Sequence, residues 1–134
     1  LGLGEQRVAV EDRRGVRELL GGEVRDRLAA LAGADVGVIV SDSFGRAWRQ
    51  GTTDVAIGVS GMSPLLDLRA TDDAGGRPLE STIIAVADEL AGAAELVMGK
   101  AEGVPAALVR GYRVRAGDGS SRELVMPPER DLFP

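Results

Sequence analysis

A carboxylate flanked by two hydroxyls, Ser41-Asp42-Ser43, directly follows a β-branched run at residues 36–40. The run predicts a buried strand, and Ser and Asp are typical of the turn that ends one. Sheets with helices on their faces usually bind ligands at the carboxyl ends of their strands. Asp42 can therefore ligate a divalent cation there, with a neighbouring hydroxyl completing the coordination. An ordinary turn, in which Asp42 accepts a hydrogen bond from its own backbone, is the alternative.

Two arginines lie in the polar loop that we expect at residues 45–53. Arg46 and Arg49 are three residues apart, with Gly45 and Gly51 on either side. Both guanidiniums can reach phosphate oxygens and bind them bidentately. The alternative is that both are solvated. Trp48, the only tryptophan, can stack on a ring ligand or serve as a half-buried anchor.

A second candidate segment contains Lys100, the only lysine among the 16 basic residues. The segment resembles a phosphate loop only superficially, because Ala94 and Ala101 break the G-x-x-x-x-G-K-[ST] pattern. It also follows an expected helix, whose negative dipole end would face the phosphates. A Walker-type site is thus rejected. A loop that contacts phosphate or base, and a helix end with a solvated lysine, both stay open for Met98, Gly99, Lys100, Ala101, Glu102, Gly103, Val104 and Pro105.

The composition restricts the chemistry further. The 134 residues carry a net charge of −5 and contain neither histidine nor cysteine. Zinc and thiolate sites are excluded, so a bound metal should be hard and oxygen-ligated, such as Mg²⁺ or Mn²⁺. The negative charge argues against nucleic acid as a partner. Without an 18-residue apolar run or a basic leader, we expect no membrane segment and a cytoplasmic protein.

Apolar periodicity supplies the elements that must position these residues. It predicts helices over 16–32, ending at Gly33, and from a cap at Ser81 or Thr82 to Met98, ending at Gly99. Strands are predicted over 36–40, 54–60, 106–110 and 123–126, with 61–78 irregular. Asp67, Asp72 and Asp73 are interpreted as loop charges, while Asp88 and Glu95 share a helix face, mostly as solvated charges. The order predicts one layered domain of mixed helix and sheet over residues 1–134.

Several strings, all in one order, carry a family resemblance. They are VIVSDSFGRAWRQGTTDVAIG at 38–58, IAVADEL at 84–90, AAELVMG at 93–99, VRGY at 109–112 and DLF at 131–133. The chain closely resembles the coenzyme F420-0:L-glutamate ligase (F420 γ-glutamyl ligase) family over about residues 36–112, and more loosely elsewhere. The resemblance implies the α+β fold of that family. It also implies that residues 1–134 are the carboxy-terminal part of a larger ligase domain, because nothing before Leu20 resembles the family's preceding hundred or so residues.

The resemblance implies a ligase that uses GTP and two divalent cations (Mg²⁺ or Mn²⁺) to add L-glutamate through γ-linkages to coenzyme F420-0, a deazaflavin. GTP would phosphorylate the substrate carboxyl, and the glutamate amine would attack the acyl phosphate. Asp42 matches a metal-ligating Asp, and Ser43 stands where the family often has a metal-ligating Thr. Residues 98–105 match the loop that contacts GTP, and the family's habit implies a homodimer.

Lys100 occupies a position where some members of that family have a metal-ligating Gln. A protonated ammonium cannot ligate a cation, so a phosphate contact is favoured for it. The rival hypothesis is a non-catalytic module that binds nucleotide or deazaflavin, because this chain would hold about half of the family's active site. A structural domain whose acids are all surface charges is the third interpretation.

Overall fold

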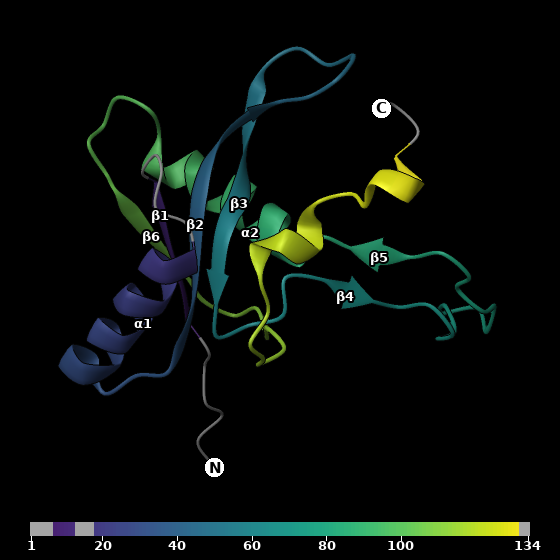
Figure 1. The fold of residues 1–134 in the computed structure, drawn as a ribbon, viewed down its shortest axis with the longest axis horizontal. Coiled ribbons are helices and arrows are strands. Elements are labelled where there is room, and N and C mark those ends of the chain that lie inside the picture. Colours follow the sequence, from purple (N-terminus) through teal and green to yellow (C-terminus); the bar gives the residue numbers. More distant parts are fainter. Residues whose placement is uncertain (1–6, 13–17, 132–134) are drawn as a thin grey trace.

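The computed structural model describes residues 7–12 and 18–131, with side chains described from Leu20 onwards. A four-stranded sheet in the order β3-β2-β1-β6 forms the centre of the fold (Figure 1). Its strands are β1 (Arg7–Asp12), β2 (Val36–Gly45), β3 (Thr52–Ser60) and β6 (Ala106–Val109). The helices are α1 (Glu18–Ala32) and α2 (Val86–Met98), followed by two short 3-10 helices, η1 (Ser121–Leu124) and η2 (Pro128–Arg130).

Strand pairing follows from the connections. β1 and β2 run parallel, with Arg7 opposite Val36, and α1 is the crossover that joins them. β2 and β3 form an antiparallel hairpin, and β6 returns antiparallel to β1. The result is a mixed sheet, and the predicted α+β class is confirmed.

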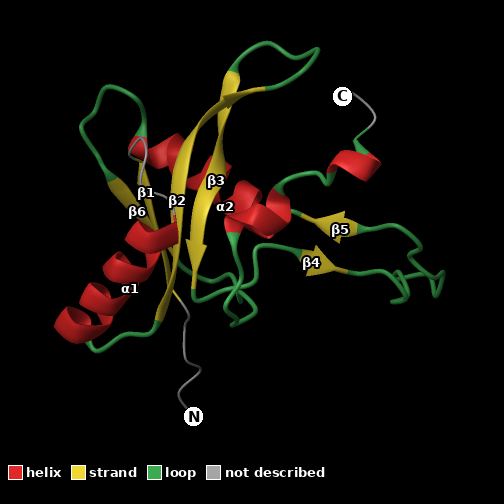
Figure 2. Ribbon diagram, viewed as in Figure 1, coloured by secondary structure: helices red, strands yellow, loops and turns green. Residues whose placement is uncertain are grey.

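The two helices lie on opposite faces of the sheet (Figure 2). Alternation along β2 explains this arrangement, because successive side chains point to opposite faces. Val40 faces Gly21 of α1, whereas Ile39 belongs to the core beneath α2. That core also contains Val59, Met62, Ala87, Leu90, Ala91 and Ala94. Small alanines on α2 let its axis approach the strands closely.

A β-bulge interrupts the β2–β3 hairpin just before Ser41. Val40 pairs with Gly58 and Ser41 with Ala56, which leaves Ile57 as the extra residue. Two side chains satisfy the backbone groups near the bulge. The Ala56 N–H donates to Asp88 of α2 at 2.9 Å, and the Ser121 hydroxyl donates to the Ile57 carbonyl at 3.0 Å. Asp88, interpreted above as a solvated helix charge, instead joins α2 to the sheet.

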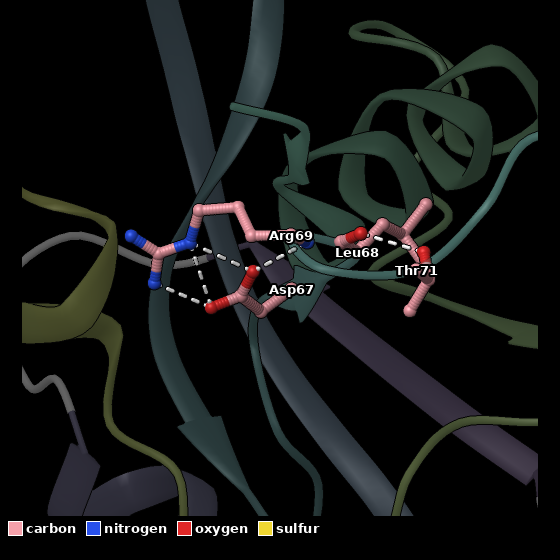
Figure 3. A network of polar contacts seen from close by, with 4 residues as sticks. All are labelled: Asp67, Leu68, Arg69 and Thr71. Carbon is pink, nitrogen blue, oxygen red and sulfur yellow. Dashed lines mark hydrogen bonds and ion pairs between the residues drawn. The ribbon is translucent and has the colours of Figure 1, made fainter. Parts of the chain in front are cut away.

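A two-stranded ribbon, β4 (Leu66–Asp67) and β5 (Ile83–Ile84), extends away from the sheet (Figure 1). Asp67 accepts hydrogen bonds from both the side chain and the backbone N–H of Arg69 (Figure 3). Asp73 accepts from the backbone N–H groups of Gly75 and Arg77. Both carboxylates are occupied by nearby residues. Asp73 lies in a turn, as predicted, whereas Asp67 is the last residue of β4 rather than part of a loop.

Several predicted elements differ in the structure. The strand predicted to stop at residue 40 continues to Gly45, because β3 supplies pairing partners as far as Thr52. Helix α2 begins at Val86 rather than at Ser81 or Thr82, because the preceding residues pair with β4. Residues 121–124 form a 3-10 helix, capped by Ser120 and Glu123, in place of the strand predicted at 123–126. The positive φ angles of Gly33 and Gly99 confirm both predicted helix ends.

None of the helices in the described parts of the chain is long and apolar enough to cross a membrane.

Replacing either of two leucines of α2 with alanine tests the packing of this helix. Leu90 is 7% exposed in the core, whereas Leu96 is 82% exposed. Leu90→Ala should lower the free energy of unfolding by about 3 kcal/mol, since it removes buried methyl groups and leaves a cavity. Leu96→Ala should change it by less than about 0.5 kcal/mol. Urea denaturation followed by circular dichroism measures both, and equal losses would contradict the packing.

The ribbon supplies a prediction about pH. The side-chain hydrogen bond from Arg69 lowers the pKa of Asp67 from 3.8 to about 2. Because the folded-state value is depressed, the pair stabilises the fold above pH 3.8, and that contribution is lost as the pH falls through about 2. A carboxyl-carbon NMR titration should find Asp67 near 2, and Arg69→Gln should return its pKa towards 3.8. Arg77→Gln is the matched control and should leave Asp67 unchanged.

Candidate functional site

A buried carboxylate, Asp54, lies at the centre of the strongest polar cluster on the α2 side of the sheet. Its side chain is 1% exposed, and each of its oxygens has a partner. Oδ1 accepts from the Lys100 ammonium at 2.8 Å, and Oδ2 accepts from the Ser41 hydroxyl at 2.9 Å. The Glu95 carboxylate lies 3.7 Å from the same ammonium. We call Ser41, Asp54, Glu95 and Lys100 the Asp54 cluster.

Three elements bring this cluster together. Asp54 shares its strand face with Ala56, which packs in the core under α2. Glu95 lies in the last turn of α2, and Gly99 ends that helix with a φ of 62° and an N–H bond to the Glu95 carbonyl. The chain then turns back, and Lys100 reaches the sheet. Sequence reasoning identified Lys100 but missed Asp54. The available signal was an acid two residues before a core position on the same predicted strand.

The structure places Asp42 and Ser43 inside β2 rather than in a turn. Asp42 is half-buried, and its Oδ1 accepts the backbone N–H of Ser43 at 2.8 Å. Adjacent strand residues point to opposite faces, so Ser43 shares the face of Asp54 and Asp42 lies on the other. Pairing with β1 is described only as far as Ser41. The two side chains therefore leave β2 on opposite faces.

These two residues suit a hard cation only in part. A carboxylate and a hydroxyl are oxygen donors that Mg²⁺ and Mn²⁺ accept. Among the side chains that the structure describes, from Leu20 to Asp131, however, no three acids come close enough together to hold a metal. Mg²⁺ commonly takes only one or two protein carboxylates and fills its shell with phosphate oxygens and water. The donor set therefore fits a cation that arrives with a phosphate ligand.

The arginine loop lies at the exposed end of the β2–β3 hairpin (Figure 1). Arg46 donates to the Gln50 carbonyl at 3.1 Å, which closes the loop. Trp48 is 85% exposed and adopts a φ of 58°, an uncommon conformation for a residue with a side chain. Arg46 and Arg49 are both exposed, as a phosphate contact requires.

Within the segment 98–105, Met98 ends α2 and residues 99–105 form a largely exposed turn. Met98 is buried and fixes one end of the segment in the core. Gly99 and Gly103 adopt positive φ angles, which glycine reaches without steric strain. The Ala101 N–H donates to Glu102 at 3.0 Å. The predicted nucleotide segment is thus attached to the fold at Met98 and, through Lys100, at Asp54.

Comparison with known proteins gives one consistent result. A family model described as F420-0:gamma-glutamyl ligase matches residues 19–111. The chain is 46% identical to the coenzyme F420:L-glutamate ligase of Methanocaldococcus jannaschii, over 83% of this chain and 45% of the relative. Identity is 49% with the enzyme of the same name from Methanothermobacter thermautotrophicus, over 79% and 43%. It is 47% with that from Methanopyrus kandleri, over 83% and 46%. The chain therefore spans about half the length of these relatives.

Proposed function

The chain belongs to the F420-0:gamma-glutamyl ligase family, and from this premise we propose that the protein adds L-glutamate to coenzyme F420-0 with GTP and a divalent cation. The observation that most directly supports this proposal is that the family match, over residues 19–111, includes both Asp42 on β2 and residues 98–105. Relatives named coenzyme F420:L-glutamate ligase support the acceptor and the amino acid. The oxygen donors of Asp42 and Ser43 support the use of a metal, and the exposed guanidiniums of Arg46 and Arg49 support the use of GTP.

The proposed reaction has two transfers. A carboxylate oxygen of F420-0 attacks the γ-phosphorus of GTP, so that an acyl phosphate forms and GDP leaves. The α-amine of L-glutamate then attacks the acyl carbon, loses a proton and displaces inorganic phosphate, which leaves an amide. Phosphoryl transfer needs mainly positioning and charge neutralisation from a protein. The residues assigned below supply those two contributions.

Asp42 and Ser43 are the proposed metal ligands. The family resemblance assigns them, and their carboxylate and hydroxyl oxygens are donors that a hard cation accepts. When bound, Mg²⁺ or Mn²⁺ would neutralise charge that develops on the transferring phosphoryl group. Arg46 and Arg49, both exposed in the adjoining loop, are the proposed phosphate contacts.

Residues 98–105 are the proposed nucleotide segment. Residues 100–105 are exposed and the chain turns sharply at Gly99 and Gly103, so the backbone of residues 102–104 is accessible to an anionic ligand. We further propose that the protein is a homodimer, as the resemblance implies, and that it works in the cytoplasm. Neither nucleic acid nor a membrane is among the proposed partners.

A non-catalytic module that binds nucleotide or deazaflavin is the second candidate. One observation favours it: among the side chains that the structure describes, no three acids come close enough together to hold a metal. A ligase needs the remaining contacts from residues outside those described here. A module needs only to bind nucleotide or deazaflavin. The ligase and the module therefore differ in whether they catalyse turnover.

One experiment separates the candidates and tests the metal assignment. Calorimetric titration of the full polypeptide that carries this chain, with GTP and Mn²⁺, should show micromolar, metal-dependent binding, and amide formation should follow when F420-0 and glutamate are added. Asp42→Asn keeps the acceptor for the Ser43 N–H but removes the charge. It should lower turnover at least about 100-fold, because a cation contributes several kcal/mol to the transition state.

The control removes the same charge from the ribbon. Asp72→Asn lies on an exposed turn, so its turnover should match that of the unmodified protein. Near-normal turnover in Asp42→Asn would remove Asp42 from the site. Binding without turnover would favour the module.

A further inference from the structure

Lys100 is held by two carboxylates from different parts of the chain. Its ammonium donates to Asp54 on β3, 46 residues away in sequence, and lies 3.7 Å from Glu95 on α2. Its side chain is about half exposed, whereas that of Asp54 is 1% exposed. The pair thus joins a solvent-facing turn to a fixed point inside the fold.

The charges of the cluster argue against a simple phosphate role for Lys100. One ammonium faces two carboxylates, so the local formal charge is negative rather than positive. An anion that approaches Lys100 also approaches Glu95, and like charges repel at such distances. The attraction that a lone lysine would offer to phosphate is therefore largely offset.

The same geometry suits an anchor. A carboxylate buried as deeply as Asp54 must be paired, because an unpaired buried charge costs several kcal/mol. Ser41 satisfies one oxygen from within the sheet, and Lys100 satisfies the other from the turn. Since Lys100 directly follows Gly99, where α2 ends, its attachment fixes the direction in which residues 98–105 leave the helix.

We propose that Asp54 is a positioning residue for the nucleotide segment: it anchors Lys100, and the anchored backbone of residues 98–105, rather than the ammonium, binds the phosphates. The inference rests on the proposed function for its ligand and on the Asp54 cluster for its mechanism. Asp54 itself touches no nucleotide in this scheme. Its influence on binding passes through Lys100.

The direction in which Asp54→Asn changes GTP affinity distinguishes the two possible roles of Lys100. Asp54→Asn is nearly isosteric and keeps an acceptor for Ser41, but it removes the charge that holds the ammonium. If Lys100 were a phosphate cation, releasing it would strengthen GTP binding or leave it unchanged. If Asp54 anchors the segment, GTP binding should weaken at least about tenfold, the lower end for one charged hydrogen bond.

The substitutions form a double-mutant cycle measured by calorimetry with GTP and Mn²⁺ on the full polypeptide. Lys100→Met should weaken binding by a similar factor. The double variant Asp54→Asn/Lys100→Met should be no weaker than either single variant, because both remove one interaction. It also leaves no buried charge unpaired, so it keeps the test valid where Lys100→Met fails to fold. Asp67→Asn, which removes an exposed carboxylate from the ribbon, should bind as the unmodified protein does.

Hydrogen exchange supplies a readout that needs no ligand. Asp54→Asn should increase exchange of the Gly99 and Ala101 amides, which donate to the Glu95 carbonyl and to Glu102, while leaving the β2 and β3 amides protected. A merely structural role would instead raise exchange across α2 and the hairpin together. Unchanged exchange in residues 99–105 would overturn the anchor.

The outcomes separate this inference from the proposed function. Should the unmodified protein fail to bind GTP, the proposed function is wrong, and the inference falls with it for lack of a nucleotide to position. Should it bind GTP while Asp54→Asn binds equally well or better, the proposed function stands and the positioning role of Asp54 is wrong. Weaker GTP binding by Asp54→Asn, with increased amide exchange confined to residues 99–105, supports both the proposed function and the positioning role of Asp54.

Discussion

The arrangement depends on a buried carboxylate that cannot stay unpaired. Asp54 lies in the layer between the sheet and α2, where water cannot solvate its charge. Its two partners come from β2 and from the turn after α2, so satisfying one side chain holds three segments in register. Apolar packing would place α2 on the sheet in any case. The ion pair specifies where the chain leaves the helix.

Polar groups on the sheet side of α2 extend this constraint along its length. Asp88 near the helix start accepts the Ala56 N–H beside the bulge, and Glu95, seven residues later, faces the Lys100 ammonium. Seven residues are close to two helical turns, so both acids project from one side. Leu90, Ala91 and Ala94 lie between them in the core. The helix is thus attached to the sheet by apolar packing in its middle and by polar contacts at both ends.

The sequence could predict whatever depends on local pattern. Gly33 and Gly99 ended helices as predicted, because a left-handed residue after a helix is a local requirement. The continuation of β2 through Ser41-Asp42-Ser43 could not be predicted, because residues with turn preference are held in the strand by pairing with β3. Asp54 was missed for a related reason, since its ion pair spans 46 positions. Long-range pairing leaves no periodic signal in a single sequence. The metal and nucleotide residues themselves stay predictions.

Alternation along β2 gives the neighbouring residues Ser41 and Asp42 different tasks. Ser41 is fully buried and donates to Asp54, so its hydroxyl is used within the fold. Asp42 points to the opposite face, where it is only half-buried and needs no counter-ion to be stable. A carboxylate can therefore be spared for a cation at position 42, whereas the carboxylate at 54 is already committed to Lys100. A one-residue slip of β3 against β2 would turn Asp54 to the opposite face, towards Asp42 and away from Lys100. The bulge before Ser41, with its backbone groups satisfied by Asp88 and Ser121, fixes the register that keeps the two acids apart.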